Sequence, residues 1–144
     1  MRTFHVTKLT MKKGGGIPTL PFLRMKECVL GKHYALSLVV AGDAYARKLN
    51  RLYRKKSYIP NVLAFPLERG VGEIILSMAQ AKRECAVREA SFRFFVALLF
   101  VHALLHLKGC RHGRIMERQE RALLSKFHIN NTFRTERRKG VRKI

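Results

Sequence analysis

The chain has 144 residues, of which 30 are Lys or Arg and 9 are Asp or Glu, so its formal net charge is +21. This length favours a single domain with a core of its own, and an apolar content of 47% is typical of a globular rather than a disordered protein. So large a positive charge is atypical of an ordinary metabolic enzyme and indicates a polyanionic partner.

Neither a membrane nor secretion is indicated. The longest apolar run, Phe94 to Val101, has eight residues, and His102 and His106 follow it closely. It therefore falls short of the ~20 apolar residues that a spanning helix needs. The first 16 residues contain no continuous apolar stretch ahead of a small-residue cleavage site, so we expect no secretory signal and a cytoplasmic location.

The N-terminal part predicts a strand followed by a helix. Residues Thr3 to Thr10 alternate loosely and are rich in Phe, Val and Thr, which is typical of a short strand. Either Pro18 or Pro21 suits the first turn of the helix, and Gly31 would end it. We expect the apolar face of this helix to be formed by Leu20, Leu23, Cys28 and Leu30.

A second strand and a basic helix are predicted next. Tyr34 to Ala41 is rich in strand-forming residues, and Asp43 is a suitable N-cap for the helix that follows. The spacing predicts that Tyr45, Leu49 and Leu52 lie on one side of that helix, with Arg47, Lys48, Arg51 and Arg54 on the other.

The middle of the chain predicts two more strands and then a long helical region. Two prolines bracket the segment from Ser57 to Pro66, so its core, Asn61 to Phe65, is expected to be an edge strand. A further strand spans Gly72 to Met78. Ala79 to Leu107 has helical periodicity, with a break near Glu89 to Ser91, and the almost wholly apolar second helix is predicted to lie at the centre of the core.

The C-terminal part predicts one more helix and a basic tail. The helix spans Arg114 to Phe127, with Ile115, Ala122, Leu123 and Phe127 expected on its inner face. Residues 131–144 form the tail, whose last 11 residues hold six cations and one acid. The interleaved strands and helices predict one α/β or α+β domain over residues 1–130.

Three histidines form the most informative motif. His102 and His106 are four residues apart on the predicted helix, so their rings project from one face, one turn apart. Gly109 lets the chain leave the helix, and His112 can then return to the same point. Three neutral imidazoles that leave a fourth position for water are typical of a catalytic zinc site, in which the pKa of the water falls towards ~7. A histidine pair alone would more often be packing or solvation, but the third histidine favours a metal site.

The same spacing occurs in the metzincin protease motif H-E-x-x-H-x-x-G-x-x-H. Here Ala103 follows the first histidine, so the carboxylate that acts as general base in peptide hydrolysis is missing. A protease would need a glutamate from elsewhere, with Glu73 or Glu117 as the candidates. The high positive charge suits an enzyme that cuts a phosphodiester chain better.

Three motifs in order resemble the YbeY ribosomal RNA maturation endoribonucleases. The histidine segment His102 to His112 is similar to the family pattern H-G-x-x-H-x-x-G-Y-D-H. Residues Leu49 to Pro66 resemble the family string L-N-x-x-Y-R-x-K-x-x-x-T-N-V-L-S-F-P, and Gly72 to Ile74 resembles G-D-I. The resemblance covers roughly Leu38 to Phe127, which is most of the chain.

The resemblance implies a fold and an activity. The fold is a small, mostly parallel four-stranded sheet with one antiparallel edge strand and about five helices. The activity is single-strand-specific, metal-dependent RNA cleavage in maturation of the 3′ end of 16S ribosomal RNA and in ribosome quality control. The implied partners are single-stranded and ribosomal RNA and the small ribosomal subunit or its assembly factors.

The resemblance also implies roles for individual residues. Its ligands for one Zn²⁺ per chain are His102, His106 and His112. Arg54 and Lys56 match the basic pair of the family, and a forked guanidinium can clamp a phosphate bidentately. Without the resemblance, the two would be interpreted as solvated cations among the 30 of the chain. Glu73, on the G-D-I strand, would be a general base, a hydrogen-bond acceptor or simply a charge at the end of the strand.

Some positions depart from the family pattern and leave alternatives open. Arg111 stands where the family has Asp and cannot accept a hydrogen bond from an imidazole. Cys110 replaces Tyr and could become a fourth ligand, which would close the site. Arg111, together with Ala64 where the family has Ser, favours the alternative function, a non-catalytic RNA-binding ribosome assembly factor that keeps the zinc site.

Overall fold

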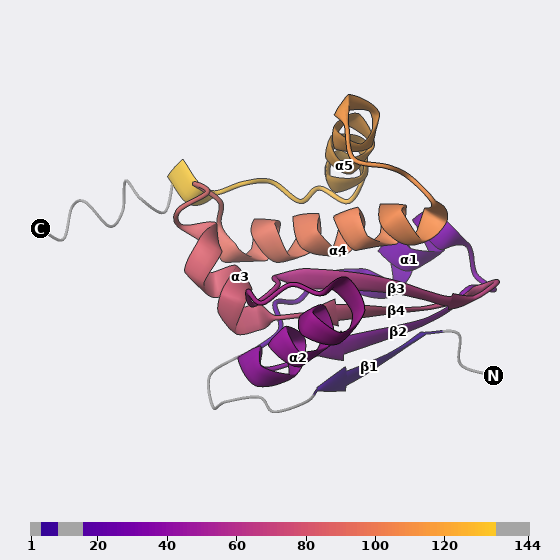
Figure 1. Cartoon of the computed structure of the whole chain (residues 1–144). Coiled ribbons are helices and arrows are strands. Elements are labelled where there is room, and N and C mark those ends of the chain that lie inside the picture. The colour runs from indigo at the N-terminus through magenta and orange to yellow at the C-terminus, as the bar shows by residue number, and fades with distance from the viewer. Residues whose placement is uncertain (1–3, 9–15, 135–144) are drawn as a thin grey trace, which may run out of the picture.

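A four-stranded mixed sheet organises the structure. The computed structural model describes residues 4–8 and 16–134 (Figure 1). The strands lie in the order β1-β2-β4-β3; β1, β2 and β4 are parallel, and β3 is antiparallel to β4. Their bounds are Phe4–Lys8 for β1, Ala35–Val40 for β2, Val62–Glu68 for β3 and Val71–Leu76 for β4. The expectation of a mostly parallel sheet with one antiparallel edge strand is confirmed.

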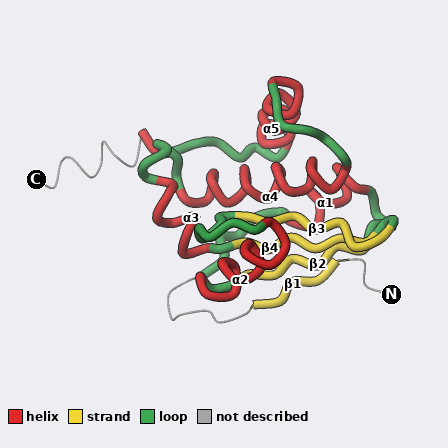
Figure 2. Tube along the Cα trace, viewed as in Figure 1, coloured by secondary structure: helices red, strands yellow, loops and turns green. Residues whose placement is uncertain are grey.

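Five helices pack on the two faces of this sheet. Their bounds are Phe22–Leu30 for α1, Asp43–Arg54 for α2, Met78–Cys85 for α3, Phe92–Lys108 for α4 and Arg114–Lys126 for α5. Helix α2 lies on one face, whereas α1, α3 and α4 lie on the other, and α5 stacks on the outer side of α4 (Figures 1 and 2). Within the described residues, no helix is long and apolar enough to cross a bilayer.

Helix α4 is the centre of the core. Nine of its 17 residues are buried, which fits its nearly continuous apolar sequence. Strand side chains alternate between the two faces of the sheet, so Leu38 and Ile74 point towards α4 whereas Val39 and Ile75 point towards α2. The prediction that this helix lies at the centre of the core is confirmed.

The helical region breaks where the sequence predicted. Residues 86–91 separate α3 from α4, and Glu89 adopts a left-handed backbone conformation with φ of 52°. Asn131 secures the start of α4, because its side-chain oxygen accepts a hydrogen bond from the backbone of Ser91 and its amide donates to the carbonyl of Glu89. Residues 135–144, which hold most of the predicted tail, lie outside the described residues.

The predicted inner faces of two helices are partly wrong. In α5, Ile115 and Ala122 are exposed, and the face that packs on α4 is formed by Met116, Glu120 and Leu124. Because the buried Glu120 is charged, the pattern of apolar residues does not show which side of α5 faces α4. In α1, Leu23 and Cys28 are exposed and the buried residues are Met25, Lys26 and Val29. Lys26 tolerates burial because its ammonium group donates to the carbonyl of Lys32 over 3.1 Å.

Two expectations for α2 also need correction. Gly42 rather than Asp43 is the N-cap, and Asp43 instead accepts a hydrogen bond over 2.8 Å from Arg83 on α3. Leu52 is 61% exposed and does not join Tyr45 and Leu49 against the sheet. The buried face of this helix includes a polar residue, Asn50. The spacing of apolar residues alone therefore does not predict which side of the helix faces the sheet.

Two side chains, those of Tyr34 and Leu107, approach the backbone of β4 closely at Gly72. A Cβ atom added at Gly72 would collide with the phenol oxygen of Tyr34 and would lie 3.1 Å from a methyl group of Leu107, near the C-terminal end of α4. The glycine therefore lets this end of α4, just beyond His106, settle onto the sheet.

We predict that Gly72→Ala destabilises the protein by about 1–3 kcal/mol through overpacking, measured as a loss of unfolding free energy in urea. Gly16→Ala is the matched control, because a Cβ there meets nothing within 4 Å. Adding Tyr34→Phe should recover part of the loss by removing the colliding oxygen. Equal stability of the two alanine variants would contradict this account of the packing.

Candidate metal centre and substrate groove

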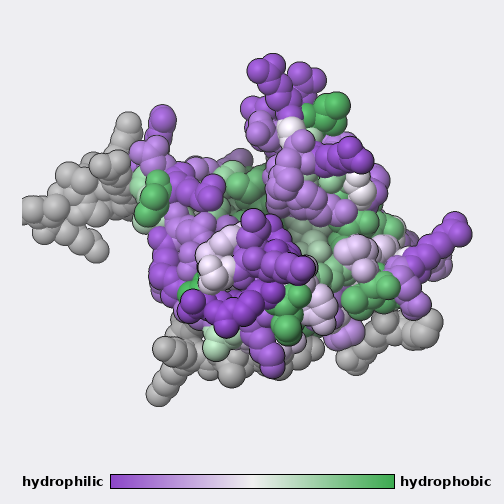
Figure 3. Space-filling view, in the orientation of Figure 1, coloured by the Kyte–Doolittle hydropathy of each residue, from purple (hydrophilic) through white to green (hydrophobic). Residues whose placement is uncertain are grey.

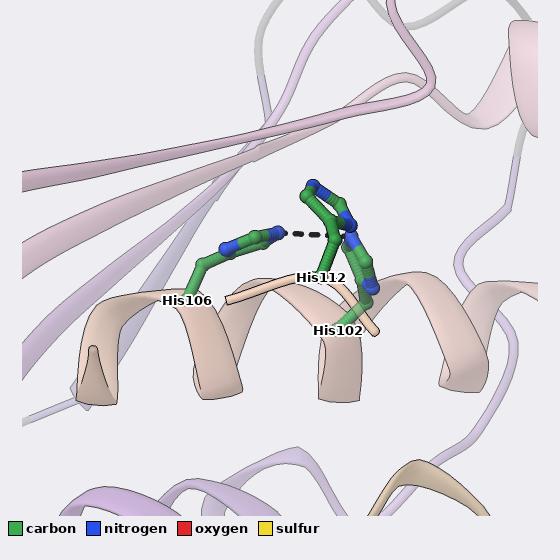
Figure 4. Close-up of side chains that lie close together, drawn as sticks. All are labelled: His102, His106 and His112. Atoms are coloured by element: carbon green, nitrogen blue, oxygen red, sulfur yellow. Dashed lines mark hydrogen bonds between the residues drawn. The ribbon is translucent and has the colours of Figure 1, made fainter. Parts of the chain in front are cut away.

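Three imidazole rings converge above α4. His102 and His106 project from successive turns of the helix, and His112 reaches them from the segment that precedes α5 (Figure 4). The Nε2 atoms of His102 and His106 are 3.0 Å apart. Each histidine offers one ring nitrogen, and the three nitrogens lie within 4.8 Å of one another. The predicted meeting of the three histidines is thus present in the structure.

The local backbone explains how His112 returns to the helix. Gly109 takes up a left-handed conformation with φ of 104°, which is strained for residues with a side chain. Its N–H donates to the carbonyl of His106, and the N–H of Cys110 donates to that of Leu105. These bonds end the helix sharply and turn the chain back over the face that carries His102 and His106.

Helix α5 supplies a partner for the first histidine. Nδ1 of His102 lies 3.3 Å from Oε2 of Glu120. Burial lowers the pKa of His102, with a smaller contribution from His112, whereas burial, with Glu117, raises the pKa of Glu120. With Nδ1–H donating to the carboxyl oxygen, Nε2 of His102 is left as a lone-pair donor that faces the other two rings.

The second histidine is also held in its neutral form. Burial lowers the pKa of His106, and the neighbouring His102, His112 and Arg54 act in the same direction, while a backbone hydrogen bond to Cys110 opposes them. A neutral imidazole is the form that binds a metal ion. The electrostatic environment of both helical histidines therefore favours the ligand state.

The residues fit a tetrahedral transition-metal site. With Zn–N bonds of about 2.0–2.1 Å, two nitrogens on one tetrahedral ion are about 3.3 Å apart, close to the 3.0 Å between the two Nε2 atoms. The thiol of Cys110 does not complete the set, because it donates to Oε1 of Gln119 over 3.5 Å. Arg111 is exposed.

The histidines open into a groove of about 870 Å³ between α4 and the edge strand β3. On one side the consecutive residues Asn61 to Phe65 line it, as expected for the open edge of a strand that, among the described residues, pairs with β4 alone. Helix α4 and Glu120 form the other side. In Figure 3, hydrophilic residues cover α2 and α5, and apolar residues show between them.

Arg54 lines this groove together with the histidines, and Asn50 positions it. Nη1 of Arg54 donates to Oδ1 of Asn50 over 3.3 Å, and the amide of Asn50 donates to the carbonyl of Tyr58 over 3.0 Å. The N–H of Lys56 donates to the carbonyl of Asn50, after a left-handed turn at Lys55 with φ of 56°. The buried Asn50 thus ties the end of α2 to the loop that leads into β3.

The structure brings together only some of the residues expected in the site. Arg54 joins the three histidines, but Lys56 is exposed and does not line the groove. Glu73 alternates with Ile74 and therefore lies with Ile75 on the α2 face of the sheet, opposite the face on which α4 packs. Glu73 is not among the residues that line the groove.

Sequence reasoning missed Glu120. Glu120 lies four residues from both Met116 and Leu124, on the same face of the helix. A carboxylate on a buried face needs a hydrogen-bond partner, so this spacing could have identified it. Sequence reasoning also missed Arg88, which lines the groove from the turn between α3 and α4.

Comparisons with known proteins agree with one another. The sequence model of the family described as Endoribonuclease YbeY matches residues 20–128. The chain is 34% identical to Endoribonuclease YbeY of Methylobacillus flagellatus over 111 residues, which are 72% of this chain and 74% of that protein. It is 34% identical to Endoribonuclease YbeY of Wolinella succinogenes over 110 residues, which are 70% and 79% of the two chains.

A solved structure agrees at the level of the fold. The solution structure of a protein from Thermotoga maritima matches with a TM-score of 0.57 at 20% sequence identity, over 85% of this chain and 89% of that one. At this identity the likeness shows the shared fold alone.

We predict that His106→Ala abolishes tight Zn²⁺ binding and that Glu120→Gln weakens it about 10- to 100-fold, because the partner of a ligating imidazole sets its orientation and basicity. Competition with a chromogenic chelator measures both affinities. Glu117→Gln is the control, because Glu117 is an exposed carboxylate on the same helix. Equal affinities of the two glutamine variants would show that Glu120 does not support the ligand.

Proposed function

The chain belongs to the YbeY endoribonuclease family, and we propose on this premise that it is a zinc-dependent endoribonuclease that cuts single-stranded RNA. The observation that carries the proposal is the convergence of His102, His106 and His112 inside a groove that Arg54 also lines. The names of the relatives support RNA as the substrate, and a net charge of +21 suits a polyanion.

Each residue of the groove has a part in this chemistry. The three histidines would hold one Zn²⁺, which when bound supplies a Lewis acid and lowers the pKa of a water molecule. Glu120 accepts the Nδ1–H of His102 and so keeps Nε2 free to bind. Arg54 presents a forked donor to a phosphate, where it would neutralise the charge that grows on the phosphate as the bond is cut.

The cellular role that we propose is processing of the 3′ end of 16S ribosomal RNA and ribosome quality control in the cytoplasm, with the small ribosomal subunit or its assembly factors as partners. The family membership supports this role. Lys56 is proposed to act at a distance, as an exposed cation that attracts the strand, because it does not line the groove. We assign Glu73 no catalytic part, because it is not among the residues that line the groove.

We expect the metal-loaded protein to cut a short unstructured RNA, and His106→Ala and His102→Ala to remove cutting together with bound zinc. Arg54→Lys should lower kcat/KM about 10- to 100-fold, which is the loss of about 1.4–2.8 kcal/mol of transition-state stabilisation from the fork. Arg51→Gln, an exposed cation on the same helix that does not line the groove, should change kcat/KM less than twofold.

The rival function is an RNA-binding assembly factor that does not cleave. Equal cutting of the RNA by the wild type and by His102→Ala would show that a contaminating nuclease is responsible. That result would leave only the binding function.

RNA binding should weaken steeply with salt. Each phosphate that the protein neutralises contributes about −0.7 to the slope of log affinity against log salt for a single strand. Titrations of a labelled RNA between low and physiological salt would measure the slope, and an affinity that does not change with salt would contradict the polyanion assignment.

A further inference from the structure

An aromatic pair, of which one ring is exposed, lines the groove. Tyr53, next to Arg54 on α2, is 68% exposed, yet its ring lies over the half-buried ring of Phe65, with centroids 5.3 Å apart and planes tilted by 59°. Both residues line the groove. Phe65 packs on the small cluster under α2 and so supports the tyrosine from one side. A ring that is so exposed contributes little to the core. One face of the Tyr53 ring is therefore available to contact a ligand.

A fixed cation lies at the other end of the same groove. The guanidinium of Arg88 is 5.6 Å from the centre of the Phe95 ring, and its Nε is 3.5 Å from Oε1 of Glu84. Glu84 is itself held by Asn61 and Gln80 over 3.1 and 2.8 Å. Because Glu84 contacts Arg88 at Nε, the fork of Arg88 keeps donors for a second anion, and its side chain is 61% exposed.

The two features lie towards opposite ends of α4. Pro66, next to Phe65, pairs with Gly72, which lies against Leu107 near the C-terminal end of the helix, whereas Arg88 lies over Phe95 near its N-terminal end. Phe95 and His106 are 11 residues apart on α4, or about 16 Å along the helix. A second hollow of about 490 Å³ shares Arg54, Asn61, Val62 and Arg88 with the groove. Exposed aromatic rings between fixed cations are the arrangement that proteins use to bind single-stranded nucleic acid.

We propose that Tyr53, supported by Phe65, is a stacking subsite for one base of the RNA, and that Arg88 holds a phosphate at the opposite end of the groove. The strand would then cross the histidine centre with Arg54 beside it. This inference rests on the proposed RNA substrate and adds to it two binding residues, Tyr53 and Arg88. A tyrosine ring accepts any base, so the subsite requires a base without selecting its sequence.

The test compares two ligands with the same number of phosphates. One is a 12-nucleotide oligouridine, and the other is the same strand with abasic sugars, each carrying a fluorophore for anisotropy titrations. All titrations use the full chain with His106→Ala, so that the strands stay intact. Tyr53→Ala should weaken binding of the oligouridine roughly 5- to 150-fold and leave binding of the abasic strand unchanged, whereas Tyr53→Phe should stay within about twofold of the parent.

Arg88→Gln should weaken both strands and reduce the salt slope by about 0.7, the value for one phosphate. Leu52→Ala, which removes an exposed apolar side chain next to Tyr53 without touching the groove, is the control for α2 and should bind like the parent. Thermal unfolding of each variant separates loss of binding from loss of fold, and rescue by Tyr53→Phe assigns the effect to the ring.

The outcomes distinguish this inference from the proposed nuclease. Cutting of RNA by the wild type together with equal affinities of Tyr53→Ala and Tyr53→Phe would overturn the stacking subsite alone. Base-dependent binding through Tyr53 in a protein that cuts nothing would remove the nuclease and support the subsite. Displacement of the RNA by an uncharged extended peptide at lower concentration than by unlabelled RNA would identify the edge of β3 as a peptide site and overturn the inference.

Discussion

Burial of α4 against the sheet is the packing interaction on which the whole site depends. Nine residues of α4 are buried, and the helix contacts the sheet, α1, α3 and α5. Contacts on several sides of α4 oppose rotation of the helix about its axis. The positions of His102 and His106 relative to the edge of β3 are therefore fixed by the packing of the core. Binding sites gain precision when they are built on rigid elements, and here the helix with the most buried residues carries two of the three rings.

The features that could be predicted are those that follow from the periodic spacing of residues along the chain. Strand alternation, the apolar run of α4 and the spacing of the three histidines with Gly109 are local patterns, so the sheet, the central helix and the meeting of the rings could be predicted. Which side of an element faces its neighbour depends on tertiary partners instead. For that reason the inner face of α5 and the side of the sheet that carries Glu73 were out of reach. A pattern that counts only apolar residues treats Glu120 and Asn50 as surface, although both are buried for their hydrogen bonds.

The open edge of β3 explains how residues from both faces of the sheet meet in one groove. Helix α2 packs on the face away from α4, yet its last turn carries Tyr53 and Arg54 to the same groove as the histidines. This is possible because, in the part of the chain that the structure describes, β3 is the last strand of the sheet and no further strand pairs with its outer edge. Arg111, which departs from the family pattern, is exposed, and the acceptor that His102 uses is Glu120 on α5.

The position of His112 links the chemistry of this protein to its architecture. His112 lies just before α5, and Glu120 lies within it, so an ion bound by the three histidines would fasten the outermost helix to the innermost one. Such an ion stabilises the folded state in proportion to how tightly it binds. An ion at this position would therefore make the anchorage of α5, and not the groove alone, dependent on the supply of metal.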